Sequence, residues 1–154
     1  MNSTEIGRVT SSDGTSIAFE RAGAGPAVIL VDAAGNFRGF RPMPQLAEAL
    51  SQSLTTFTYD RRGKGASTDT LPYAVDRELD DLQALIDMAG GSAFVHGLSS
   101  AATLGLLAAE RGSVAAGDRC CWWLAAPLPS QPGHADNAEG RRDQHPGDRA
   151  NTGG

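Results

Sequence analysis

Ser99 stands in a pattern whose small residues suit a nucleophilic serine. Gly97 precedes it by two positions and Ala101 follows it by two. A serine on a tight strand-to-helix turn usually adopts a strained backbone, and small flanking residues let the strand and helix approach each other. The turn would lift the Ser99 hydroxyl above the sheet edge at which open α/β sheets bind ligands. The pattern is short, and an ordinary strand-to-helix turn would look similar.

The residue after Ser99 has a backbone group that could stabilise negative charge. The N–H of Ser100 would lie at the N-terminus of a helix, where the helix dipole favours a developing oxyanion. Ser100 is itself the poorer nucleophile candidate, because the bulky Leu98 would then occupy the flanking position. The residue types therefore favour Ser99 as the nucleophile.

Strand patterns precede this turn along the chain. Residues 6–10 and 16–21 flank a turn that ends in Asp-Gly, which predicts a hairpin. The apolar run at 27–31 is typical of a strand buried on both faces. Residues 54–59 alternate between apolar and polar side chains, and residues 93–95 form a short strand just before the turn.

Helical patterns alternate with the later strands. Pro44 fits the first turn of a helix that carries Leu46 and Leu50. A second helix has apolar residues on one face, namely Val75, Leu79, Leu82 and Ile86. Residues 100–111 form a third, almost entirely apolar helix. Strands joined through helices cannot form hairpins, so an α/β fold is predicted: an N-terminal hairpin, then parallel strands with helices on both faces.

Three motifs in the expected order give residues 5–112 a resemblance to the α/β-hydrolase family. Residues 28–34 look like the third strand and oxyanion loop of the family, with Asp32-Ala33 where His-Gly is common. Residues 59–67, Tyr-Asp-Arg-Arg-Gly-Lys-Gly-Ala-Ser, are similar to its Asp-x-Arg-Gly-x-Gly-x-Ser loop after the fourth strand. The Ser99 turn resembles its nucleophile elbow, with Ala101 in place of the usual second glycine.

The resemblance implies a serine hydrolase that acts on a small-molecule ester or a related acyl substrate, without a cofactor. Ser99 would be the nucleophile, and the backbone N–H groups of Ala34 and Ser100 would form the oxyanion hole. The reaction would be acyl transfer to Ser99, followed by hydrolysis of the acyl-enzyme by water.

Other polar residues near these motifs have structural interpretations. Asp60, Arg61 and Arg62 are expected to fix their loop rather than to react. His96 ends a strand, and strand alternation points it and the turn serine in different directions, so we expect it to pack rather than to act as the base. Cys120-Cys121 has no further cysteine or flanking histidine, so neither a disulfide framework nor a metal site is predicted.

The composition changes near residue 112. Ile, Leu, Val and Phe together number 26 in residues 1–111 but three in residues 112–154. So few apolar side chains cannot offset the entropy lost on ordering the chain, so a domain portion at 1–111 and a largely disordered tail at 112–154 are expected. The tail shows no sixth strand pattern, and its Arg, Gly, Pro, Ala and Asp bias resembles GC-rich DNA translated in a wrong frame. We therefore hypothesise a frameshift near residue 112.

The acid and the base of a triad follow the serine in the chain order of the family. After Ser99 the sequence offers His134 and His145 as bases, and Asp118, Asp136, Asp143 and Asp148 as acids. All of these lie in the tail, for which a solvated segment is the favoured interpretation. The catalytic acid and base therefore stay unassigned.

Composition also bounds the function class. A net charge of −5 without a basic stripe argues against nucleic-acid binding, and no apolar run reaches the ~18 residues of a membrane span. The N-terminus does not resemble a signal peptide, so a cytoplasmic protein with a small-molecule substrate is expected.

Two alternatives to an active hydrolase are open. One is an inactive or non-enzymatic fragment that keeps the N-terminal half of the sheet and self-associates through an open edge. The other is a dinucleotide-binding protein, which is disfavoured because Gly23-x-Gly25 lacks a third glycine at the required spacing and precedes a strand.

Overall fold

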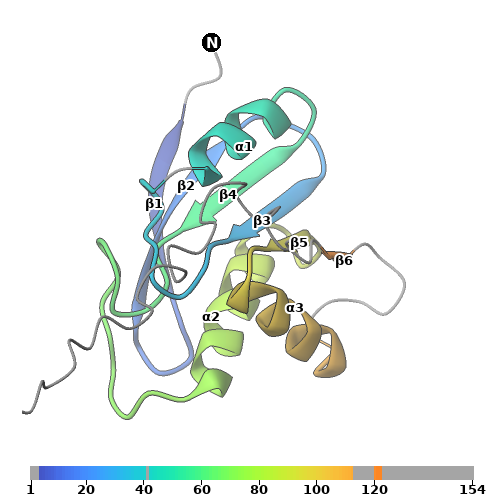
Figure 1. Ribbon diagram of the computed structural model, residues 1–154. Coiled ribbons are helices and arrows are strands. Elements are labelled where there is room, and N and C mark those ends of the chain that lie inside the picture. Colours follow the sequence, from blue (N-terminus) through green and yellow to red (C-terminus); the bar gives the residue numbers. More distant parts are fainter. Residues whose placement is uncertain (1–3, 41, 113–119, 123–154) are drawn as a thin grey trace, which may run out of the picture.

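The computed structural model describes residues 4–40, 42–112 and 120–122. Strands and helices alternate after an N-terminal pair of strands (Figure 1). In chain order the elements are β1 (Glu5–Thr10), β2 (Ser16–Ala22), β3 (Ala27–Val31), α1 (Met43–Leu50), β4 (Thr55–Tyr59), α2 (Val75–Met88), β5 (Phe94–Gly97), α3 (Ser100–Glu110) and β6 (Cys120–Trp122).

The strands form one mixed sheet in the order β1-β2-β4-β3-β5-β6. β1 pairs with β2 antiparallel, and β2 pairs with β4 antiparallel. The pairs β3–β4, β3–β5 and β5–β6 are all parallel. The predicted hairpin at one edge and the predicted parallel later strands are therefore confirmed.

Helices cover both faces of this sheet, as predicted (Figure 1). The larger apolar cluster packs α2 and α3 against the sheet, with Ile29, Leu82 and Ala108 among its most buried members. A smaller cluster on the opposite face joins α1 to the sheet through Met43, Val28 and Leu30. The order of elements and the two layers place the β5–α3 junction at the carboxyl edge of the parallel strands, beside the end of β3.

The tail contains one element that the sequence analysis did not expect. Cys120–Trp122 forms β6, which pairs parallel to β5 at the register Val95↔Cys120. The expectation of no sixth strand was wrong because it counted Ile, Leu, Val and Phe, and left out tryptophan, which is enriched in strands. The rest of the expected disordered tail, residues 113–119 and 123–154, lies outside the described residues. The frameshift near residue 112 therefore stays a hypothesis.

Candidate functional site

The turn between β5 and α3 has the backbone geometry predicted for a nucleophile elbow. Ser99 has φ 56° and ψ −121°, and it is the one non-glycine residue with positive φ in the described part of the chain. Because side chains with a Cβ rarely adopt this region, the conformation is strained. Ser99 precedes the first residue of α3 and is an exposed residue.

Hydrogen bonds on both sides hold this turn in place. The N–H of Leu98 donates to the Val31 carbonyl oxygen at 3.0 Å, which ties the turn to the end of β3. On the helix side, the N–H of Ala102 donates to the Ser99 carbonyl oxygen at 2.9 Å. The strained conformation of Ser99 is therefore maintained by its hydrogen-bonded connections to the end of β3 and to α3.

Gly97 permits the close approach of β5 and α3. A Cβ atom at this position would lie 2.5 Å from the carbonyl carbon of Ala101 and 2.6 Å from the backbone nitrogen of Ala102, and it would also meet the Ala101 oxygen. These are backbone atoms of the helix, so no side-chain rotation could relieve the clash. Ala101 is completely buried, so the replacement of the second glycine by alanine is accommodated within the core.

The predicted oxyanion loop is anchored by Asp32, the residue that stands where histidine is common. Its Oδ1 accepts hydrogen bonds from the Ala33 N–H at 2.7 Å and from the Asn36 side-chain amide at 2.9 Å. Its Oδ2 is buried and has no partner within the described ranges. The Asn36 N–H closes a turn onto the Ala33 carbonyl oxygen at 3.0 Å.

The structure brings together the two residues predicted to form the oxyanion hole, but in an unexpected way. The N–H of Ala34 donates to the side-chain Oγ of Ser100 at 3.1 Å. This contact spans 66 positions in sequence, and no local pattern in the sequence signals it. The Ser100 side chain is therefore a candidate site group that the sequence reasoning missed.

Asp60 is a structural residue, as expected. It is buried, and its two carboxylate oxygens accept hydrogen bonds from the backbone N–H groups of Arg38 at 2.7 Å and Ala66 at 2.9 Å. Gly65 runs so close to it that an added Cβ would strike the Asp60 carboxylate. The carboxylate is enclosed by the loop that it organises.

Arg61 connects this loop to the oxyanion loop. It donates two hydrogen bonds to the Glu78 carboxylate and one to the Asp32 carbonyl oxygen at 3.3 Å. The Tyr73 hydroxyl donates to the same carboxylate at 2.7 Å. Burial would raise the pKa of Glu78, but the hydrogen bonds from Arg61 and Tyr73 outweigh it and hold the pKa below its usual value.

Arg62 is the third charged residue of this loop and is also structural. Its guanidinium donates to Asp81 at 2.7 and 2.8 Å and to Asp13 at 2.9 Å. The hydrogen bond from Arg62 holds the pKa of Asp13 well below its usual range. The expectation that these arginines fix loops is supported by these contacts.

His96 is half-buried and lies opposite Leu30 in the parallel pairing of β3 and β5. Paired residues of neighbouring strands share a face, so His96 lies on the side of the sheet covered by α1. Burial lowers the pKa of His96, and its imidazole makes no hydrogen bond with another described residue. These observations fit the packing role expected for it, not the role of a base for Ser99.

The other candidate bases, His134 and His145, lie outside the described residues. Within 4–40, 42–112 and 120–122, no group of three or more His, Cys, Asp or Glu residues could hold a metal ion. No helix in the same ranges is long and apolar enough to cross a membrane.

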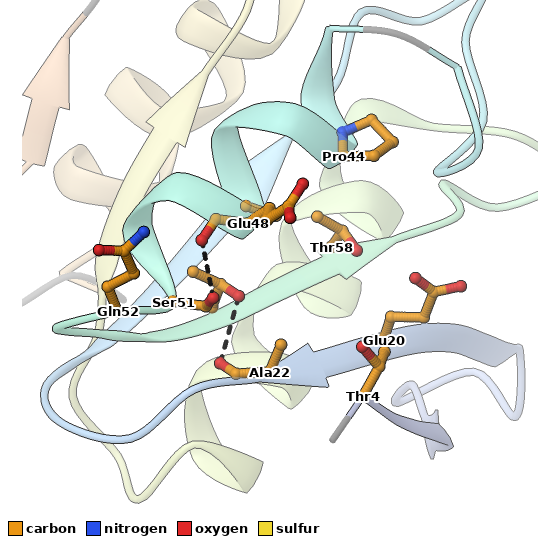
Figure 2. Close-up of a pocket in the computed structure, with 10 residues that line it drawn as sticks. Thr4, Glu20, Ala22, Pro44, Glu48, Ser51, Gln52 and Thr58 are labelled. Carbon is orange, nitrogen blue, oxygen red and sulfur yellow. Dashed lines mark hydrogen bonds between the residues drawn. The ribbon is translucent and has the colours of Figure 1, made fainter. Parts of the chain in front are cut away.

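Of the pockets along the described part of the molecule, two bear on the question of a site. A pocket of about 480 Å³ between α1 and strands β2 and β4 is lined by Glu20, Glu48 and Thr58 among others, and Figure 2 shows these side chains around it. Neither the Ser99 turn nor the oxyanion loop contributes to its lining. A pocket of about 330 Å³ is lined by Ala34 of the predicted oxyanion loop together with Arg61 and Tyr73, and neither Ser99 nor Ser100 contributes to its lining.

Neither a protein-family profile nor a curated protein sequence matches the chain. Solved structures do. An α/β hydrolase from Sphaerobacter thermophilus is 57% identical, with a TM-score of 0.66, and the match covers 69% of this chain and 40% of that one. The bottromycin epimerase BotH, solved with bottromycin A2, is 25% identical over 68% of this chain and 43% of its own, with a TM-score of 0.62.

An epoxide hydrolase from Vigna radiata has the same fold at 22% identity and a TM-score of 0.64, over 71% of this chain and 36% of its own. The chain thus spans less than half the length of each of these three proteins. These matches cover the sheet and helices described above. The N-terminal part of this chain is an α/β-hydrolase-like segment.

Proposed function

We propose that this chain carries the nucleophile portion of a serine hydrolase that acts on small-molecule esters or related acyl compounds. The observation that carries the proposal is the backbone of Ser99, strained at positive φ and exposed at the start of α3. Strain of this kind persists where the surrounding structure enforces it, and it is characteristic of sites at which a side chain must be presented to a substrate. The likeness to an α/β hydrolase of 57% identity supports the same role.

The proposed reaction has two steps. The Ser99 oxygen bonds to the acyl carbon while its proton passes to a base, and the negative carbonyl oxygen is stabilised by hydrogen-bond donors at the start of α3. The alcohol then leaves with a proton, and the acyl group stays on Ser99. Water adds to this ester, the bond to Ser99 breaks, and the acid and the free hydroxyl are released.

The base is the part of this mechanism that the described residues do not supply. His96 is the one histidine among them, and it makes no hydrogen bond to Ser99. A serine hydroxyl without an adjacent base is a weak nucleophile. An inactive fragment of a larger hydrolase is therefore the second candidate, favoured by the 40% of the Sphaerobacter protein that the chain spans.

Labelling with a fluorophosphonate tests the nucleophile. The serine oxygen would bond to phosphorus as the P–F bond breaks, fluoride leaves, and the hydroxyl proton passes to a buffer base. After prolonged incubation with excess probe, we expect slow labelling, which peptide mass spectrometry would locate on Ser99. The adduct should be absent from the Ser99→Ala variant. Labelling that survives in Ser99→Ala, or a chain with no adduct on Ser99, would overturn the proposal.

A further inference from the structure

The N–H of Ala34 is already occupied in this structure. An amide has a single hydrogen to donate, and that of Ala34 points to the Oγ of Ser100 at 3.1 Å. The loop that carries Ala34 is fixed on its other side by Asp32, whose Oδ1 binds the Ala33 N–H and the Asn36 amide. Ala34 is therefore oriented toward the Ser100 hydroxyl rather than toward an open space for a substrate oxygen.

The Ser100 hydroxyl has a donor to spare. A hydroxyl offers one hydrogen and two acceptor lone pairs, and the contact with Ala34 uses one lone pair. Its own hydrogen has no acceptor among the residues that the structure describes. Ser100 is exposed and follows Ser99 directly as the first residue of α3, so this hydrogen is available beside the proposed nucleophile.

We propose that the side-chain hydroxyl of Ser100 is a catalytic donor to the oxyanion, in addition to the N–H of the same residue. This inference rests on the proposed role of Ser99. A free hydroxyl rotates, but acceptance of the Ala34 hydrogen bond restricts Oγ, and a hydroxyl that accepts one hydrogen bond donates a stronger one. Ala34 is then a positioning residue, because its N–H orients the Ser100 hydroxyl. Asp32 in turn holds the loop that carries Ala34.

If the Ser100 hydroxyl blocked the oxyanion site instead of donating to it, the effect of its removal on the labelling rate would have the opposite sign. If Ser100 Oγ only occupied the Ala34 N–H, an oxyanion would have to displace it, and its removal would free a donor and speed the attack. If Ser100 instead donates to the oxyanion, its removal takes a donor away and slows the attack. The sign of the change therefore distinguishes the two arrangements.

The test compares rate constants for fluorophosphonate labelling at Ser99 in the full chain. Loss of one donor in a water-excluded site slows a reaction ~10²–10³-fold, and the exposure of Ser100 reduces that effect, so we expect Ser100→Ala to label about 10-fold more slowly. Ser100→Thr, which keeps the hydroxyl, should label close to the unsubstituted rate. Thr103→Ala, which removes another exposed hydroxyl of α3, is the matched control and should label at the unsubstituted rate.

Hydrogen exchange at the Ala34 amide provides a readout independent of reaction. It should be faster in Ser100→Ala than in Ser100→Thr. Ser99-dependent labelling that Ser100→Ala leaves unchanged or accelerates would overturn this inference and leave Ser99 as the nucleophile. Absence of any Ser99-dependent labelling in the unsubstituted chain would overturn the proposed function, and this inference with it.

Discussion

At the scale of single residues, the backbone conformation of Ser99 depends on the absence of a side chain at Gly97. Ser99 is held at positive φ because β5 and α3 meet closely, and they meet closely because Gly97 has no side chain. Sequence reasoning could predict both properties, since small residues on both sides of a serine at a strand-to-helix junction permit the tight turn of a nucleophile elbow. It could not predict the contact of Ser100 with Ala34, because two residues 66 positions apart meet only through the pairing of β3 and β5.

Substitution of Gly97 by alanine should destabilise the protein. The new Cβ would lie 2.5 Å from the Ala101 carbonyl carbon, so the helix must shift, and overpacking of this kind costs about 1–3 kcal/mol. Urea denaturation should show that loss in the free energy of unfolding. Gly35→Ala is the matched control, because an added Cβ there meets nothing within 4 Å. Equal stability of the two variants would refute the packing argument.

At the scale of elements, the buried arginines connect the loop after β4 to other segments through ion pairs. Arg62 links the loop after β4 to α2 through Asp81 and to the β1–β2 turn through Asp13. A pH dependence follows from these ion pairs. Because Arg62 depresses the pKa of Asp13 in the folded state, the pair stabilises the fold above the usual carboxyl pKa of about 4. That stabilisation is lost as the pH falls below this value.

The urea midpoint should therefore decrease between pH 6 and pH 3. Asp13→Asn should be less stable than the unsubstituted chain at pH 6, because it leaves one guanidinium hydrogen bond of Arg62 without an ionised acceptor. Its midpoint should fall less steeply with acid, because one depressed carboxyl has been removed. Asp69→Asn, which removes an exposed carboxyl from the loop that carries Arg62, should keep the steep profile. Identical slopes for Asp13→Asn and the unsubstituted chain would show that this pair does not contribute.

The elements themselves could be predicted well where periodicity is strong. The hairpin strands begin and end within one residue of the expected positions, and the residues expected on the first two helices lie within α1 and α2. The alternation in residues 54–59 predicted a strand, and all five residues of β4 are buried, including the polar Thr56 and Thr58. β4 lies between β2 and β3 in the sheet, and Thr56 satisfies its hydroxyl at the Ala22 carbonyl oxygen. Polar residues thus lie in a central strand. Their burial follows from the order of the strands in the sheet, which the alternation within one strand does not reveal.

At the scale of the whole molecule, the described residues contain the proposed nucleophile and the proposed oxyanion donors, and they supply no base for them. The Ser99 turn, the oxyanion loop and the Arg61–Glu78 pair are assembled within residues 4–112. In triad-deleted proteases, such donors alone leave ~10³–10⁴-fold catalysis over water. Here Ser99 and Ser100 are exposed, which weakens electrostatic stabilisation, so a smaller effect is expected.

Hydrolysis of p-nitrophenyl acetate by the full chain tests this account most directly. We expect a rate at or barely above that of buffer, and whatever excess occurs should disappear in Ser99→Ala. His134→Ala and His145→Ala should leave the rate unchanged, because neither histidine is assigned to the site. Rapid hydrolysis that requires Ser99 together with His134 or His145 would contradict the account, since it would show that residues beyond Gly112 supply the base and complete an active hydrolase.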